Sequence, residues 1–351
     1  MRSPSVLRAA VLLAVVLDPP VLGLAGRRLT GEPRVEQWEA DGVPVEVVRP
    51  RGSGPWPTWL FVNGAHPERR AEPVVQRLSR GLARAGYLVL VPDVPGLGEG
   101  TITARTLEAT AAVTGAAVRR RDVEGGRVAL IGASTGAALA LLTAARDDLA
   151  DHVSIVAAVT PFGDLERMVC LATTRGYAES GGFTRYDVTV LLRHVAARSL
   201  VATIADEAER ARLLSALDRA DADGLDPIEA LPEPDELSPQ GRAIVRMLRN
   251  DDPELFADIF RSLPDDVHTL LASLSPLKVA PGVRAPVEIV VPPADAYFPP
   301  GEARALAAVL PRAHLTVTGT LDHTRPDLSL GQLRDLVSFG RFVVRGLAAA
   351  G

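Results

Sequence analysis

A serine flanked by glycines is the first feature of this sequence that could do chemistry. The segment Gly132-Ala133-Ser134-Thr135-Gly136 has the pattern G-x-S-x-G. A serine hydroxyl is a poor nucleophile until a base removes its proton, and a tight strand-to-helix turn lifts its oxygen toward such a base. The apolar segment RVALI precedes the motif and the apolar segment AALALLTAA follows it. The pattern therefore predicts a nucleophilic Ser134, and the alternative is a glycine-rich turn whose serine caps a helix.

The base that such a serine needs is expected late in the chain. In proteins with this serine turn, the catalytic partners follow in the order serine, acid, histidine. Two histidines lie after position 300. His314 falls in HLTVTG, which has the pattern of a strand, whereas His323 falls in TLDHTRP, a loop before the last predicted helix. The position in that loop predicts His323 as the base.

The acid that orients this base has one favoured candidate and one alternative. Asp295 lies in PPADAYFPP, in the loop just past the predicted strand 287–291. A carboxylate there would hold the imidazole and stabilise its protonated form. Asp164 in TPFGD follows another predicted strand and remains the alternative acid. Asp322 is a weaker candidate, because side chains adjacent in sequence seldom face each other.

An oxyanion formed at the serine would need two backbone N–H donors. Thr135, at the start of the helix after the serine, is expected to supply one of them. The loop Asn63-Gly64-Ala65-His66 follows the apolar segment WLFV and is expected to supply the other. Ala65 is the preferred donor in that loop and His66 the second choice.

The elements that must position these residues alternate between strands and helices. Predicted strands cover 35–40, 45–48, 58–62, 87–91, 127–131, 153–159, 287–291 and 314–317. Predicted helices cover 71–85, 101–121, the segment after Gly136 through Ala145, 301–310 and 330–349. This order predicts an α/β fold with a mostly parallel central sheet covered by helices on both faces.

The alternation stops between the sixth strand and the seventh. Residues 162–277 show mainly helical periodicity, broken by proline-rich and acidic loops such as LPEPDELSP. We expect a helical cap or lid here, inserted between the core segments 29–161 and 278–351; the alternative is that part of it is ordinary sheet-flanking helix. Its aliphatic clusters suit a small-molecule ester substrate with an apolar acyl or alkyl group.

The N-terminal residues 1–28 resemble a targeting segment. Arg2 and Arg8 precede or border an apolar run that reaches Leu17, and Arg27 and Arg28 follow. This pattern predicts a signal peptide or an uncleaved anchor, and hence an exported or membrane-anchored protein of the cell envelope. The alternative is a helix packed on the domain of a cytoplasmic protein.

Composition excludes several other functions. The net charge is −5, which gives a nucleic-acid partner no electrostatic support. Cys170 is the only cysteine and lies in the apolar segment VCLATT, so neither an intrachain disulfide nor a reactive thiol is expected. The segment GLGEG lacks the full dinucleotide fingerprint. No HExxH motif or cysteine/histidine cluster is present, so neither a metal nor a cofactor is predicted.

Several segments together resemble the α/β-hydrolase superfamily. They are VNGAHPE, YLVLVPDVPGLGEG, GRVALIGASTGAA, APVEIVVPPADAYFPP and LDHTRP, in the order of that superfamily. The resemblance covers about residues 35–160 and 285–350. It implies hydrolysis of an ester, thioester or amide without a cofactor, as in serine esterases, lipases and, more distantly, dienelactone hydrolases. The chain departs from the last group, whose nucleophile is a cysteine, and it has Pro292-Pro293 where a glycine is commoner.

These observations predict a serine hydrolase that cleaves a carboxylic ester through an acyl-enzyme. Ser134, Asp295 and His323 would form its triad, with the N–H groups of Ala65 and Thr135 binding the oxyanion. The alternative from another class is a non-catalytic protein of the same fold, acting as a binding or scaffolding module at the membrane.

Overall fold

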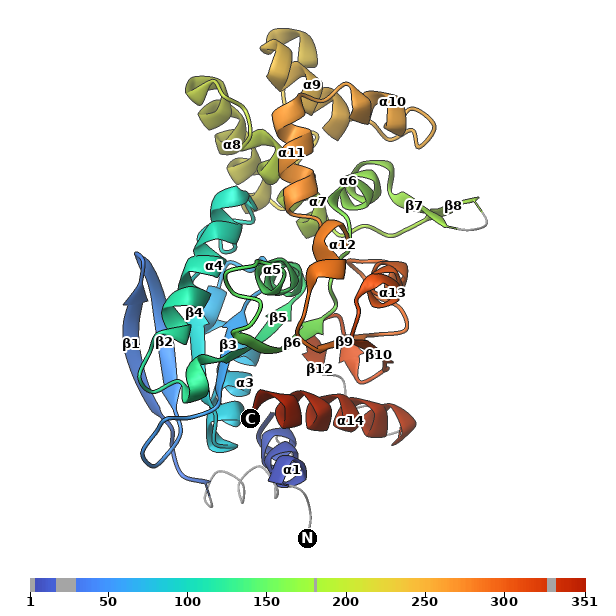
Figure 1. Cartoon of the computed structure of the whole chain (residues 1–351). Coiled ribbons are helices and arrows are strands. Elements are labelled where there is room, and N and C mark those ends of the chain that lie inside the picture. Colours follow the sequence, from blue (N-terminus) through green and yellow to red (C-terminus); the bar gives the residue numbers. More distant parts are fainter. Residues whose placement is uncertain (1–3, 17–29, 180–181, 327–332) are drawn as a thin grey trace. The chain divides into compact units, whose positions relative to one another are not determined.

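The computed structural model describes residues 4–16, 30–179, 182–326 and 333–351. These residues form two compact units (Figure 1). The first unit comprises the described residues up to Gly98 together with Arg105–Gly163 and Pro276–Gly351. The second comprises Glu99–Ala104 and Asp164–Ser275.

An eight-stranded sheet organises the first unit, in the order β1-β2-β4-β3-β5-β6-β9-β10. All pairings from β4 to β10 are parallel, and β1 and β2 join antiparallel at one edge. The strands are β1 (Arg34–Ala40), β2 (Val43–Arg49), β3 (Thr58–Val62), β4 (Leu88–Pro92), β5 (Val128–Ala133), β6 (Val153–Val159), β9 (Val287–Val291) and β10 (Ala313–Val317). The prediction of an α/β fold with a mostly parallel sheet is confirmed.

Burial explains why the central strands are mainly apolar. Every residue of β3, β4 and β9 is buried, because helices cover both faces of the sheet. The edge hairpin β1–β2 instead turns at Asp41 and Gly42, whose φ angles of 50° and 79° are both positive. Such a pair of positive φ angles matches the twist of antiparallel strands, and it favours Asp-Gly at this position.

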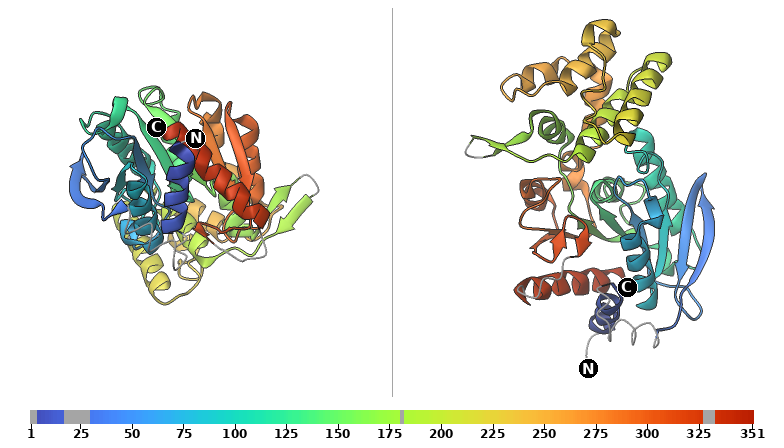
Figure 2. Two further views of the ribbon diagram at one scale, coloured as in Figure 1. Left: turned by 90° about the horizontal axis from the view of Figure 1, so that it is seen from below. Right: turned by 180° about the vertical axis from the view of Figure 1, so that it is seen from behind.

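Helices α1, α3 and α14 pack on one face of the sheet, and the left view of Figure 2 shows α1 and α14 on that side. Helices α4, α5 and α13 lie on the opposite side in Figure 1. The bounds are α1 (Pro4–Val16), α3 (Pro73–Arg84), α4 (Ala104–Val118), α5 (Thr135–Ala144), α12 (Pro276–Val279), α13 (Pro300–Val309) and α14 (Leu333–Ala350).

Helix α1 packs on the first unit through one side. Ala9 and Leu12 are buried in the core that α3 and α14 also line. The Arg8 guanidinium donates to the Tyr87 hydroxyl at 3.2 Å and to the Gly351 carbonyl at 3.1 Å. Burial raises the pKa of Tyr87 despite the nearby charge of Arg8. Across the described ranges, no helix has both the length and the hydropathy to cross a membrane. The predicted targeting segment also includes residues 1–3 and 17–28, which lie outside the described residues.

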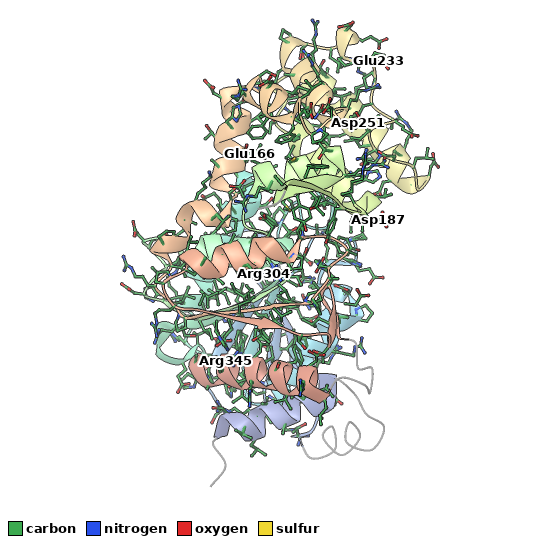
Figure 3. The ribbon with its side chains drawn as sticks, turned by 90° about the vertical axis from the view of Figure 1, so that its right-hand side faces the viewer. Glu166, Asp187, Glu233, Asp251, Arg304 and Arg345 are labelled. Atoms are coloured by element: carbon green, nitrogen blue, oxygen red, sulfur yellow. The ribbon has the colours of Figure 1, made fainter. Side chains whose placement is uncertain are left out.

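A partly buried ion pair joins α14 to the two strands at one edge of the sheet. Arg345, labelled in Figure 3, donates to both carboxylate oxygens of Glu288 at 2.7 and 2.8 Å. The same guanidinium donates to the Thr316 hydroxyl at 3.1 Å. Glu288 lies on β9 and Thr316 on β10, so one arginine braces two strands whose following loops carry the predicted acid and base. A bidentate arginine–carboxylate pair fixes geometry more strictly than a single hydrogen bond does.

A second ionic cluster lies at the other end of the sheet. The Asp122 carboxylate accepts hydrogen bonds from Arg120 at 2.9 and 2.8 Å and pairs with Arg49 of β2 at 2.8 Å. The Arg120 guanidinium lies 4.4 Å from the ring centroid of Trp38 on β1. Burial pushes the pKa of Asp122 upward, but the two arginines more than offset this and hold the pKa below its ordinary value.

The second unit is mainly helical and has a core of its own. Its helices are α6 (Leu165–Thr174), α7 (Val190–Val201), α8 (Glu207–Ala222), α9 (Pro239–Leu248), α10 (Phe256–Arg261) and α11 (Asp265–Ser273). Many apolar residues of this segment are buried in this core, among them Leu200, Leu213, Ile244 and Phe260. Burial also raises the pKa of the Cys170 thiol on α6, which keeps that thiol protonated and unreactive at neutral pH.

One strand pair in the second unit was not predicted. Strands β7 (Gly176–Glu179) and β8 (Gly182–Arg185) form an antiparallel hairpin. A side chain at Gly176 would begin 2.3 Å from the ring of Phe183, so glycine allows that ring to lie against the backbone. The residues of β8 are all exposed and show no apolar alternation, which explains why the sequence pattern did not reveal the hairpin.

The ends of the segment between β6 and β9 lie close together. The Leu277 N–H donates to the Gly163 carbonyl at 2.9 Å, and the Gly163 N–H donates to the Glu302 carboxylate at 2.9 Å. All three residues belong to the first unit. The longer segment of the second unit, Asp164–Ser275, therefore leaves the first unit and returns to it at one point; the short segment Glu99–Ala104 leaves and returns separately.

Candidate active site

The predicted site residues of the first unit follow strands that run in one direction. Strands β3, β5, β9 and β10 belong to the parallel part of the sheet, so their carboxyl ends share an edge. In open α/β sheets, ligands bind in the crevice beyond the carboxyl ends of the strands. Ala65, Ser134, Asp295 and His323 all lie in segments that follow these ends.

Ser134 occupies the turn between β5 and α5. Its φ of 55° and ψ of −122° are rare for a residue with a side chain. The Ser134 N–H donates to the Val159 carbonyl of β6 at 2.8 Å, which helps to hold this turn. A side chain at Gly136 would begin 2.1 Å from the Val62 carbonyl oxygen, and one at Gly132 would begin 2.2 Å from that of Gly136. Both glycines are therefore required for the helix to lie this close to the sheet.

The loop after β3 lies beside the serine. A side chain at Gly64 would begin 3.3 Å from the Ser134 Cβ and 3.2 Å from the Ala133 carbonyl oxygen. This contact places the loop that carries Ala65 next to the nucleophile turn. The His66 ring accepts a hydrogen bond from the Glu68 N–H at 3.3 Å, so this ring bonds within its own loop.

Asp295 and His323 form a hydrogen-bonded pair. The His323 Nδ1 lies 2.8 Å from the Asp295 Oδ2, and the two side chains are 11% and 3% exposed respectively. A carboxylate accepts, so Nδ1–H donates and Nε2 keeps its lone pair for accepting a proton. His323 has a φ of 50° and lies in the two-residue connection between β11 (Leu321–Asp322) and β12 (Arg325–Pro326).

Two aromatic rings surround the imidazole of this pair. The ring centroid of Tyr297 lies 4.3 Å from that of His323, with an interplanar angle of 34°. The Phe298 ring meets the imidazole edge-on, at 5.6 Å and 72°. Phe162 in turn packs edge-on against Phe298 at 5.5 Å. Sequence reasoning missed both ring contacts, although the position of Tyr297 and Phe298 next to Asp295 was a usable signal.

The other candidate residues have different surroundings. The Asp164 carboxylate caps α6 by accepting from the N–H groups of Glu166 at 2.9 Å and Arg167 at 3.4 Å. His314 is exposed on β10, as sequence reasoning placed it on a strand. Asp322 is exposed on β11. The acid that the structure pairs with His323 is thus the favoured candidate, Asp295.

Asn63 is a further residue of the site region that sequence reasoning did not single out. It follows β3 directly and is only 3% exposed. Among the described residues, neither its amide nitrogen nor its amide oxygen has a hydrogen-bond partner. A polar residue between a buried strand and a glycine was the available signal.

Within the same described ranges, no group of three or more His, Cys, Asp or Glu side chains is placed to hold a metal ion.

The fold and the serine turn define a serine hydrolase of the α/β-hydrolase fold. Residues 39–240 match the family model described as X-Pro dipeptidyl-peptidase (S15 family), and this range is more than half of the chain. The chain therefore belongs to that family. The matched range includes Ala65, Ser134 and Asp164, whereas Asp295 and His323 lie beyond it. A comparison with curated protein sequences finds no match.

Solved structures show the same fold at low sequence identity. A 2,6-dihydroxy-pseudo-oxynicotine hydrolase is 16% identical with a TM-score of 0.51, over 94% of this chain and 72% of that one. Dipeptidyl peptidase 4 of Porphyromonas gingivalis is 13% identical with a TM-score of 0.51, over 89% of this chain and 35% of that one. The acylaminoacyl peptidase of Pyrococcus horikoshii is 11% identical with a TM-score of 0.51, over 90% of this chain and 40% of that one.

Proposed function

We propose that this protein cleaves a carboxylic ester through an acyl-enzyme formed on Ser134. The observation that carries the proposal is the hydrogen bond between His323 and Asp295, in loops that follow β10 and β9. The strained turn of Ser134 follows a strand of the same parallel sheet. A serine, a histidine and an acid delivered by loops beyond parallel strands are the parts of an acyl-transfer triad.

In this mechanism the Ser134 Oγ attacks the carbonyl carbon of the ester. His323 accepts the serine proton at Nε2 and passes it to the leaving alcohol, while Asp295 holds Nδ1 and stabilises the imidazolium. The N–H groups of Ala65 and Thr135 bind the oxyanion of the tetrahedral intermediate. Water, deprotonated by His323, then attacks the acyl-enzyme and releases the acid.

The first test removes the nucleophile. Alanine at position 134 adds no bulk to the turn, so Ser134→Ala should keep the fold, judged by circular dichroism. Because the triad acts as a unit, we expect turnover of p-nitrophenyl butyrate to fall by about 10⁴-fold or more. A fluorophosphonate probe should label the wild-type protein and not this variant. Wild-type activity in Ser134→Ala would refute the mechanism, whereas a wild-type protein with neither ester turnover nor probe labelling would favour a non-catalytic binding or scaffolding protein.

The second test concerns the acyl group, which we propose to be apolar. Many aliphatic residues of the insertion lie in the core of the second unit, and Val190 and Leu191 of α7 are among those left exposed. Each methylene buried by the enzyme contributes about 0.8 kcal/mol, close to fourfold in kcat/KM. We expect kcat/KM to rise about tenfold or more from p-nitrophenyl acetate to the octanoate. A flat or falling series contradicts the apolar acyl group.

A second candidate function is release of a dipeptide after proline. The family match favours it, because the family model is described as X-Pro dipeptidyl-peptidase. The same triad would serve, with His323 donating its proton to a leaving amine instead of an alcohol. Gly-Pro-p-nitroanilide, assayed beside the ester series, separates the two. A higher kcat/KM for the anilide than for every ester would replace ester hydrolysis with peptidase activity.

A further inference from the structure

We propose that Tyr297 is a positioning residue that holds the His323 imidazole in its reactive orientation. This inference rests on the proposed function and adds a residue to its machinery. The Tyr297 ring lies 4.3 Å from the imidazole, centroid to centroid, and the two planes are inclined by only 34°. Nothing in the triad pattern of the sequence requires an aromatic residue at this position.

His323 needs a restraint beyond its bond to Asp295. One hydrogen bond at Nδ1 fixes one atom of the ring, but it leaves the imidazole able to tilt about that contact. The backbone of His323 is also unusual, since its φ of 50° is rare for a residue with a side chain. A ring packed against the imidazole, tilted by 34° with its centroid 4.3 Å away, restricts this motion, and it thereby fixes the direction of Nε2.

The segment 295–298 holds the acid and the rings together. The Asp295 Oδ1 accepts the N–H groups of Tyr297 at 2.7 Å and Phe298 at 3.0 Å, while Oδ2 bonds to His323. The position of each ring is therefore tied to the position of the carboxylate. The imidazole meets a bonded oxygen at its edge and an aromatic ring at its face, both delivered by one tight turn.

The rings of Phe298 and Tyr297 have different roles. Phe298 is buried, and Phe162 braces it at 5.5 Å, so it belongs to the packing of the first unit. Tyr297 is half-buried and covers the face of the imidazole. The face of an aromatic ring carries partial negative charge, so it also favours the imidazolium that forms when the serine proton is transferred. Tyr297 should therefore affect turnover more than substrate binding.

The experiment compares Tyr297→Leu with Tyr297→Phe on p-nitrophenyl butyrate. Leucine keeps an apolar side chain but has no aromatic face, whereas phenylalanine keeps the face and loses only the hydroxyl. Because small misplacements of reacting groups cost up to about 10²-fold, we expect Tyr297→Leu to lower kcat about 10- to 100-fold with KM within about threefold. Tyr297→Phe should restore kcat to within about twofold of the wild-type value.

A matched control uses an aromatic residue at the opposite edge of the sheet. Trp38 on β1 is also half-buried, and its ring packs on the Arg120 guanidinium at 4.4 Å. Trp38→Leu should leave kcat unchanged. All variants are checked by circular dichroism and thermal unfolding, and Tyr297→Met replaces Tyr297→Leu if the leucine variant does not fold.

Three results would overturn the inference. They are an unchanged kcat in the aliphatic variant, an equal loss of kcat in Tyr297→Phe, and a rise in KM with kcat unchanged. The second would assign the effect to the hydroxyl, and the third would make Tyr297 a wall of the substrate site. Ser134→Ala in the same assay tests the proposed function separately. An active Ser134→Ala variant would refute the proposed triad as a whole. An inactive one would support the triad, whatever the Tyr297 variants show.

Discussion

Two aspartates follow neighbouring strands of the sheet, and their carboxylates accept the same pattern of backbone hydrogen bonds. After β6, Asp164 accepts the N–H groups two and three residues further along the chain, and after β9, Asp295 does the same. The chain beyond the two aspartates then takes different paths. Helix α6 starts directly after Asp164, whereas α13 begins only at Pro300, and the turn after Asp295 presents Oδ2 to His323. The same local capping geometry thus serves a helix in one region and an imidazole in the other.

The largest difference between the two aspartates is expected in kcat, which Asp295→Asn should lower far more than Asp164→Asn does. An amide in place of the carboxylate cannot stabilise the imidazolium and favours the wrong tautomer of His323, so kcat for p-nitrophenyl butyrate should fall on the order of 10⁴-fold. The folded state should persist, because the asparagine side-chain oxygen can still accept the Tyr297 and Phe298 N–H groups. Steady-state kinetics and thermal unfolding measure the two properties.

The matched control is Asp164→Asn. Asparagine caps helices about as well as aspartate does, so this variant should change neither stability nor kcat strongly. If Asp164→Asn loses far more activity than Asp295→Asn, the acid of the triad is Asp164, and the contrast between the two regions is reversed.

A third carboxylate, that of Asp122, is expected to affect the free energy of unfolding and not kcat. Asp122 has charged partners but lies in no part of the proposed chemistry, so Asp122→Asn should leave kcat unchanged. Weakening the charged hydrogen bonds that Arg120 donates and the ion pair with Arg49 should lower the free energy of unfolding by about 1.5 to 3 kcal/mol at pH 7. Chemical denaturation of both proteins across a pH series measures this difference.

The pH dependence of that difference has a defined sign. The pKa of Asp122 is lower in the folded protein than in the unfolded chain. Its contribution to stability is therefore complete above the unfolded pKa and is lost as the pH falls through the folded pKa. The gap between wild type and Asp122→Asn should begin to narrow below about pH 4 and should close as the pH falls through the lowered folded pKa. A gap that is constant down to strongly acidic pH would show that the ion pairs do not carry the effect.

Much of the first unit could be predicted from sequence because its strands are buried on both faces. Such strands appear as short, mainly apolar runs, and the predicted strands 58–62, 153–159 and 287–291 have the same bounds as β3, β6 and β9. The two glycines of the serine motif were also informative, because the close approach of α5 to β3 leaves no room for a side chain at Gly136.

The rest of the molecule depends on contacts that no local pattern records. The contact between Tyr297 and His323 joins residues from separate loops, and every residue of β8 is exposed, so that strand shows no alternation. The aliphatic clusters of the insertion were interpreted as walls for a substrate, yet many of them form the core of the second unit. Periodicity indicates that a face is buried, but it does not say against what.

The hydrogen bond between Leu277 and Gly163 has a consequence in polymer terms. With respect to the sheet, the whole segment between these residues is a loop. Its ends are held together by the hydrogen bond from the Leu277 N–H to the Gly163 carbonyl at 2.9 Å. The entropic cost of closing a loop grows only with the logarithm of its length, about 0.6 kcal/mol for each doubling. A segment closed in this way can be lengthened, shortened or exchanged while the strands on either side keep their register. We therefore expect that the first unit can accept a different insertion at this point while the strands that precede the serine, the acid and the base keep their positions.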